Sequence, residues 1–125
     1  MVEQRVARLR HKHVVAGIAE QTYQADLASL AEVKRLAADV RADHDALDVL
    51  INNAGIGSGK PDLATRQESA DGIELRFAVN YLATFALTLG LLPIIRRRIV
   101  NVASIGQAPI DFDDPMIEHG YDGSR

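Results

Sequence analysis

The chain has 125 residues, which suits one domain, and its net charge of −3 excludes a general electrostatic attraction to nucleic acid or to an anionic membrane. It has no cysteine, which excludes a disulfide framework, a thiol nucleophile and a thiolate metal site. We find no apolar run that approaches the length of a membrane span, and therefore expect a cytoplasmic protein with no metal, nucleic-acid or membrane partner.

The N-terminal half predicts two helices and two strands. Residues 2–12 are basic and indicate a polar helix, and the partly alternating residues 14–25 indicate a short strand that ends near Asp26. Ser29 and Glu32 have the S-x-x-E spacing of a helix start, and apolar residues then recur at helical spacing as far as Val40. "LDVLI", residues 47–51, is short and apolar without alternation, which is typical of a parallel strand covered by helices on both faces.

The C-terminal half predicts a loop, a helix and a strand. Residues 55–72 hold most of the turn-forming residues, and residues 73–92 predict a long helix that Pro93 ends or kinks. This helix places its larger apolar residues on one broad stripe: Phe77, Tyr81, Leu82, Phe85, Leu89 and Leu92. "RRR", residues 96–98, indicates a solvated helix end, and "RIVNVAS", residues 98–104, indicates a second buried strand followed by surface loop.

This order of elements predicts a parallel α/β layer structure, in which ligands bind beyond the carboxyl ends of the strands. "NNAG", residues 52–55, follows a strand, so polar side chains can meet a ligand there and small residues allow it close to the backbone. Ser104 follows the next strand and suits a polarising hydroxyl and a loop cap equally well. Asn80 interrupts an apolar helix, and we expect it to be a buried amide that serves either the structure or a site.

Four segments together resemble the short-chain dehydrogenase/reductase family: "QADLASL", "LDVLINNAG", "RFAVNYLATFALT" and "RIVNVASIGQ". "RQESADGIELRFAVNYL" and "IGQAPIDFDDPMIEHGYDG" are similar to bacterial members related to retinol dehydrogenases and WW-domain oxidoreductases. The resemblance covers roughly residues 22 to 125. It implies a Rossmann-type doubly wound parallel sheet, of which residues 1–125 form a single incomplete NAD(P)-binding domain with the third to fifth strands and their helices.

The resemblance also implies a cofactor, NAD or NADP, and a small carbonyl/alcohol substrate pair. The implied cofactor-binding residues are Asp26 and Leu27, which would hydrogen-bond and flank the adenine, together with Asn53, Ala54 and Gly55. Asn52 would brace the sheet. In catalysis, Asn80 would hold a water of the proton relay and Ser104 would hydrogen-bond the substrate oxygen.

The sequence departs from the family pattern in three places. It contains neither the family's T-G-x-x-x-G-x-G loop nor the second strand whose end chooses between NAD and NADP, and it contains no Y-x-x-x-K. Tyr121 is followed four residues later by Arg125, so we predict that it is not the family's acid/base tyrosine.

Three hypotheses about function follow. The chain is the central piece of an NAD(P)-dependent oxidoreductase, with background turnover on its own; or a non-catalytic interaction module; or a truncated gene product with no function of its own. The strand at residues 47–51 would carry an open apolar edge, which predicts self-association and marginal stability.

Overall fold

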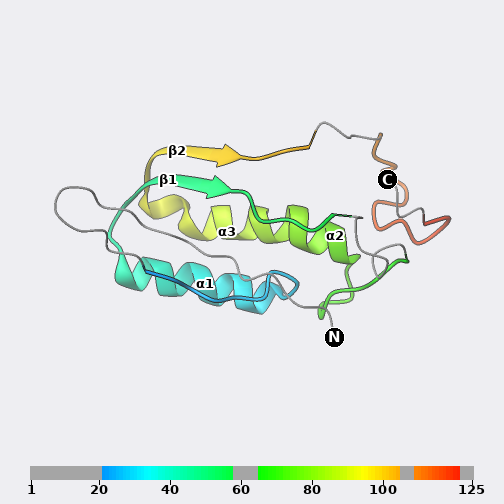
Figure 1. Cartoon of the computed structure of the whole chain (residues 1–125), viewed down its shortest axis with the longest axis horizontal. Helices are drawn as coiled ribbons and strands as arrows, with labels where there is room; N and C mark the ends of the chain where they lie inside the picture. Colours follow the sequence, from blue (N-terminus) through cyan, green and yellow to red (C-terminus); the bar gives the residue numbers. More distant parts are fainter. Residues whose placement is uncertain (1–20, 58–64, 105–108, 122–125) are drawn as a thin grey trace.

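The computed structural model describes residues 21–57, 65–104 and 109–121 (Figure 1). Helix α1 (Leu30–Asp43) is followed by strand β1 (Leu47–Asn52). A long helix then runs through α2 (Leu75–Phe77), the π-helical turn η2 (Ala78–Leu82), α3 (Ala83–Leu91) and the 3-10 turn η3 (Leu92–Ile94). It leads directly into strand β2 (Ile95–Asn101). The predicted helix at residues 2–12 lies outside the described residues.

The elements form layers, with the two strands on one side, the long helix next to them and α1 beyond it (Figure 1). β1 and β2 are hydrogen-bonded in parallel, as the sequence predicted, and the long helix returns between them in the opposite direction. α1 packs against α3. The carboxyl ends of both strands and the N-terminal ends of α1 and the long helix therefore lie toward the same end of the molecule (Figure 1).

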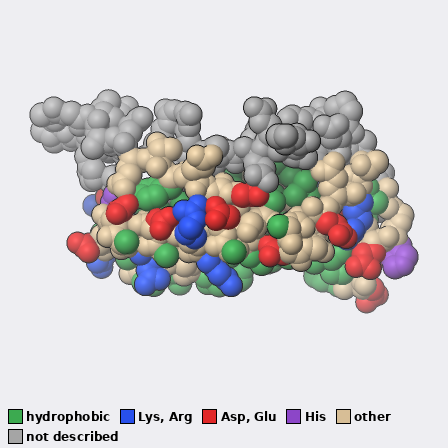
Figure 2. Space-filling model, turned by 90° about the horizontal axis from the view of Figure 1, so that it is seen from below, with side chains coloured by type: hydrophobic (Ala, Val, Ile, Leu, Met, Phe, Trp, Pro, Cys, Tyr) green, Lys and Arg blue, Asp and Glu red, His purple; other side chains and the backbone are tan. Residues whose placement is uncertain are grey.

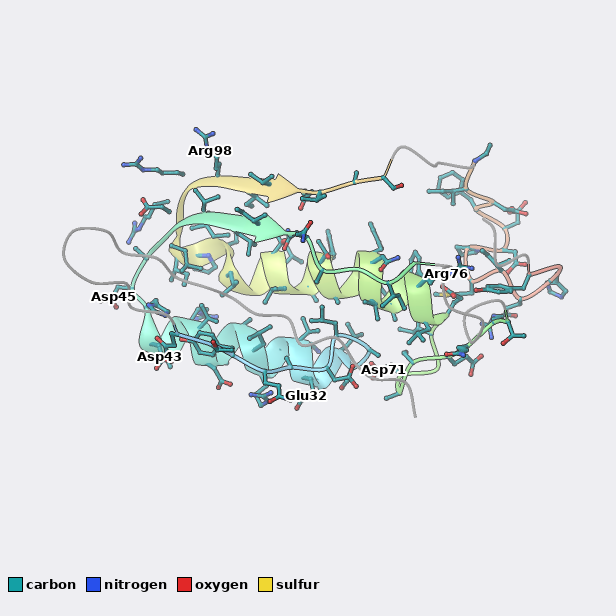
Figure 3. All side chains as sticks on the ribbon, in the orientation of Figure 1. Glu32, Asp43, Asp45, Asp71, Arg76 and Arg98 are labelled. Carbon is teal, nitrogen blue, oxygen red and sulfur yellow. The ribbon has the colours of Figure 1, made fainter. Side chains whose placement is uncertain are left out.

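The N-terminus of α1 is capped from two sides. The Ser29 hydroxyl accepts a hydrogen bond from the Glu32 backbone N–H at 3.4 Å, which confirms Ser29 as the cap; the Ser29 N–H donates to the Asp26 carbonyl at 3.2 Å, so the Glu32 half of the predicted capping box is not formed. Asp71, from the loop before the long helix, accepts a hydrogen bond from the Leu30 N–H at 2.8 Å. A carboxylate satisfies a free amide there and is favoured by the helix dipole. This contact ties the starts of the two helices together (Figure 3).

The outer face of α1 is charged and the inner face is apolar. Arg35 binds Glu32 and Asp39, each at 2.7 Å, one turn away in either direction. Figure 2, viewed from the α1 side, shows acidic and basic side chains interspersed over this face. The opposite face places its apolar side chains in the core: Val33, Leu36, Ala37 and Val40. The predicted amphipathic helix is confirmed.

The long helix differs from the prediction in its ends and in its buried face. It runs from Leu75 to Ile94, because Pro93 is accommodated in a 3-10 turn, and β2 begins at Ile95 rather than Arg98. The three arginines of residues 96–98 consequently lie in an exposed strand and not at a helix end. The predicted stripe is not the core-facing side, because four of its members are more than half exposed: Tyr81, Phe85, Leu89 and Leu92.

Leucines and smaller apolar residues occupy the face that is buried. The core-facing side chains of the long helix are Leu75, Ala78, Val79, Ala83, Leu87 and Leu91. A Cβ added to Gly90 would lie 2.7 Å from the Ala37 Cβ of α1, so the two helices approach as closely as a glycine allows. Close packing of α1 against α3 explains why the aromatic side chains of Tyr81 and Phe85 face outward.

The sheet is covered on one face only in the described part of the chain. Leu47 and Leu50 of β1 are buried, whereas Val49 is 41% and Ile51 is 58% exposed. The prediction of helices on both faces is therefore wrong for these residues. β2 carries one extra residue opposite the Leu47–Val49 step of β1, after which the pairing is regular.

The segment before α1 is not a strand where the structure describes it. Residues 21–26 form no strand and pair with neither β1 nor β2, which corrects the predicted strand at its described end; residues 14–20 lie outside the described residues. Tyr23 instead donates its hydroxyl to Asp43 at the end of α1, at 2.7 Å. Burial, followed by the hydrogen bond to Asp43, raises the pKa of Tyr23 far above its ordinary value, so the hydroxyl remains a donor.

The long helix also corrects the statement that no apolar segment approaches the length of a membrane span. Among the described residues, Leu75–Ile94 is a 20-residue helix that is long and apolar enough to cross a bilayer by length and composition alone. Core helices of globular proteins pass the same test. Here one side of the helix packs against α1.

Candidate functional site

The carboxyl end of the sheet is braced by Asn52, the last residue of β1. Its side-chain amide donates to Asn101 Oδ1 at 2.7 Å, across the sheet, and to Thr88 Oγ1 at 3.0 Å, on α3. The Asn52 carbonyl accepts a hydrogen bond from the Val102 N–H at 2.9 Å. Asn52 is only 9% exposed, so its polar atoms need these partners. The predicted bracing role is confirmed.

Asn80 holds the loop that follows β1. Its Oδ1 accepts a hydrogen bond from the Ile56 N–H at 2.8 Å, and its Nδ2 donates to the Ile56 carbonyl at 3.0 Å. A Cβ at Gly55 would come within 3.2 Å of Asn80 Oδ1, so the absence of a side chain there allows the close approach. Asn80 is exposed, which corrects the expectation of a buried amide.

The π-helical turn η2 contains Asn80. The Ala83 N–H bonds the Ala78 carbonyl, five residues back, where an α-helix would bond four residues back. Such turns are uncommon and occur frequently at functional sites. The polar clamp and the irregular turn therefore coincide on the one helix that connects β1 and β2.

Asn53, Ala54 and Gly55 are exposed beyond the end of β1. Residues 53–55 and 57 are exposed, whereas Ile56 is partly buried with its N–H and carbonyl bonded to Asn80, and a Cβ at Gly57 would meet nothing within 4 Å. A ligand can reach this stretch of backbone directly, which fits the close approach that a dinucleotide needs.

Asp26 and Leu27 form the turn into α1. Asp26 Oδ1 accepts a hydrogen bond from the Ala28 N–H at 2.8 Å, and its carbonyl accepts one from Ser29 at 3.2 Å. In this turn Asp26 is partly exposed, and Leu27 is buried among the core residues. Ser104 is exposed three residues beyond the end of β2.

Among the described residues, no group of three or more His, Asp or Glu side chains is placed to hold a metal ion. The chemistry available at the sheet end is therefore that of amides, a hydroxyl and exposed backbone. Such groups bind and orient a ligand by hydrogen bonds.

Comparison with known proteins identifies the family. The family model for short chain dehydrogenases matches residues 2–110. The chain belongs to the short-chain dehydrogenase family. It is 39% identical over 95 residues to retinol dehydrogenase 13 of Homo sapiens, a match that covers 71% of this chain and 27% of that protein.

Two solved structures extend the comparison to the fold. A crystal structure of an uncharacterized protein from Mycobacterium Paratuberculosis matches with a TM-score of 0.71 and 32% identity, over 86% of this chain and 38% of that one. A metagenomic short-chain oxidoreductase in complex with NADP matches with a TM-score of 0.58 and 29% identity, over 76% and 44%. The chain is thus a partial Rossmann-type α/β unit, as predicted, and it spans about a third of the length of the curated relatives it matches.

The short-chain dehydrogenase motifs are brought together only in part. Asn80 lies against the loop that follows Asn53–Gly55, a contact between residues 24 positions apart. Asp26 accepts its hydrogen bond from Ala28 within its own turn, and Ser104 follows the end of β2. The sequence indicated no role for Thr88 or Arg76. The structure gives each a role through its hydrogen-bond partner, which is Asn52 for Thr88 and Tyr121 for Arg76.

Proposed function

We propose that the chain provides the central part of an NAD(P)-dependent oxidoreductase that transfers hydride between a nicotinamide cofactor and a carbonyl/alcohol pair. Family membership supports the reaction class, and relatives of known structure include NADP complexes. The observation in this chain that carries the proposal is the Asn80 clamp, which holds the open backbone after β1 in a defined position.

The cofactor supplies the hydride when it is bound. We assign cofactor contacts to Asn53, Ala54 and Gly55, whose backbone is exposed, and adenine contacts to Asp26 and Leu27. The choice between NAD and NADP stays open. The similarity to retinol dehydrogenase 13 favours an apolar alcohol or aldehyde as the substrate.

Ser104 would orient and polarise the substrate oxygen through its hydroxyl. Asn80 would hold a relay water. Both polar atoms of its side chain already bond Ile56, and each has one further hydrogen-bonding position at which a water can bind. Because these 125 residues contain no Y-x-x-x-K, we predict turnover at background rate for this chain by itself. A cytoplasmic location remains a prediction from composition.

Hydrogen exchange with and without NADP or NAD tests the binding part of the proposal. We expect a cofactor to protect amides at residues 53–57, and Gly55→Val to abolish this protection by forcing a side chain toward Asn80 Oδ1. Gly57→Ala is the matched control, because its Cβ meets nothing within 4 Å. The absence of protection at millimolar concentrations of both cofactors would contradict the proposal. Reductase turnover that is lost in Ser104→Ala would instead overturn the predicted inactivity.

A non-catalytic interaction module is the second candidate, and exposed apolar side chains favour it. The outer face of the sheet exposes Val49, Ile51, Val100 and Val102, and in the described part of the chain β1 pairs with β2 alone. Such surfaces favour pairing with another sheet or with a second copy. Light scattering of the chain, alone and mixed with a complete homologue, distinguishes the candidates. A monomer in both samples that also binds no cofactor would favour a product without its own function.

A further inference from the structure

Arg76 connects the long helix to the segment that follows β2. It lies in the first turn of that helix (Figure 3), and its side chain is only 14% exposed. Arg76 Nη2 donates a hydrogen bond to the Tyr121 hydroxyl, and its guanidinium carbon lies 5.3 Å from the centre of the Tyr121 ring. One side chain therefore makes both a polar and a cation–π contact with a residue 45 positions away.

Glu74, two residues before Arg76, lies next to it at the start of the long helix. Its Oε2 accepts a hydrogen bond from the Phe77 N–H at 2.7 Å and caps the helix, while its Oε1 lies 3.9 Å from Arg76 Nε. The Glu74 side chain is 5% exposed, and among the described residues its Oε1 has no hydrogen-bond partner, so the nearby positive charges of Arg76 and Arg66 offset its buried negative charge.

The segment that Arg76 holds is itself well defined. Arg66 donates to the Met116 carbonyl at 3.2 Å and gives the segment a second anchor. Asp114 accepts hydrogen bonds from the backbone N–H groups of Glu118 at 2.8 Å and His119 at 3.0 Å. Hydrogen bonds within residues 111–119 thus stabilise a turn, and Arg66 and Arg76 attach the segment to the rest of the fold at Met116 and Tyr121.

Arg76 and Asn80 lie four residues apart, which puts them about one turn apart on one side of the helix. Asn80 clamps the loop after β1, and Arg76 clamps the segment after β2. One face of one helix thus holds both chain segments that leave the carboxyl end of the sheet.

We propose that Arg76 is a positioning residue that acts through Tyr121 to hold the described segment after β2 on the same helix whose Asn80 clamps the loop after β1. Its catalytic meaning rests on the proposed oxidoreductase function. The contact between Arg76 and Tyr121 does not depend on that function, and its effect on residues 109–121 can be measured in this chain directly.

Hydrogen exchange of the 125-residue chain tests the proposal. In Arg76→Met we expect exchange in residues 109–121 to rise on the order of tenfold, with α1 and the strands unchanged, because a hydrogen bond from a charged donor is lost. Tyr121→Phe should give a smaller rise, and the double variant should match Arg76→Met. Arg76→Lys, which keeps the charge near the ring, should restore part of the protection.

Arg98→Met is the matched control, since Arg98 is exposed on β2 away from this contact (Figure 3). Unchanged exchange in residues 109–121 of Arg76→Met, or an equal rise in Arg98→Met, would overturn the proposal. If Arg76→Met raises exchange throughout the chain, Tyr121→Phe is the decisive variant, because it removes only one hydroxyl at a partly buried site. A rise confined to residues 109–121 in Tyr121→Phe would support the proposal, and no rise there would overturn it. A failure of cofactor binding would remove the proposed function and leave the exchange result standing.

Discussion

Replacing Asn52 with alanine should remove the brace at the end of the sheet. The amide donates two hydrogen bonds, to Asn101 and to Thr88, and each contributes about 1 kcal/mol net to stability. Neither acceptor residue is buried, so water can replace the lost donor and no further penalty for an unsatisfied group is expected. The free energy of unfolding should therefore fall by about 2 kcal/mol.

Urea unfolding followed by circular dichroism measures this change, in a stabilising osmolyte that gives a folded baseline. Thr88→Val removes one of the two hydrogen bonds and should cost about 1 kcal/mol. Combined with Asn52→Ala it should add nothing, because the two changes share one contact. The exposed Asn53→Ala is the control and should change stability by less than about 0.5 kcal/mol. Equal effects of Asn52→Ala and Asn53→Ala, at an unchanged denaturant slope, would refute the reasoning.

Three further predictions concern packing, pH and the whole chain. Gly90→Ala should lower the unfolding free energy by about 1 to 3 kcal/mol in the same urea assay, because the new Cβ would lie 2.7 Å from that of Ala37. Gly57→Ala is the control and should leave the unfolding free energy unchanged, because its Cβ would meet nothing within 4 Å. Backbone hydrogen bonds, first that from Glu118, hold the pKa of Asp114 below its usual value. The turn should therefore be stable above the carboxyl's ordinary pKa and loosen as pH falls through the lowered one, seen as a fall in the protection factor of the Glu118 amide relative to the intrinsic exchange rate at each pH. A protection factor unchanged on acidification would contradict this. The isolated chain should melt broadly and with a midpoint that depends on concentration; a sharp, concentration-independent transition of large enthalpy would count against marginal stability.

The sequence predicted the parts of the structure that depend on local patterns. Ser29 and the apolar spacing after it specify α1, and the short apolar run before Asn52 specifies β1, because capping and periodicity act within a few residues. The order of strand, helix and strand then followed from connection rules. Four segments in the family's order, around Asp26, the N-N-A-G run, Asn80 and Ser104, together indicated the family, which the comparisons confirm.

The burial of the long helix was beyond such patterns. Both of its faces are apolar, so periodicity alone cannot say which one packs inward, and the larger side chains suggested the wrong face. Gly90 against Ala37 decides it, because close helix packing favours small side chains in the contact. The start of β2 was likewise missed, since Pro93 fits a 3-10 turn that a simple helix-stop rule does not anticipate.

By itself, the sequence determined the family and the order of α1, β1, the long helix and β2, since each of these depends on short motifs. Only the tertiary structure decided which segments Asn80 and Arg76 contact. Asn80 is hydrogen-bonded to Ile56, 24 positions away in the sequence, and Arg76 is hydrogen-bonded to Tyr121, 45 positions away. Contacts at such separations leave no periodic or local trace in the chain, because they exist only once helix and sheet have packed and brought the two segments together.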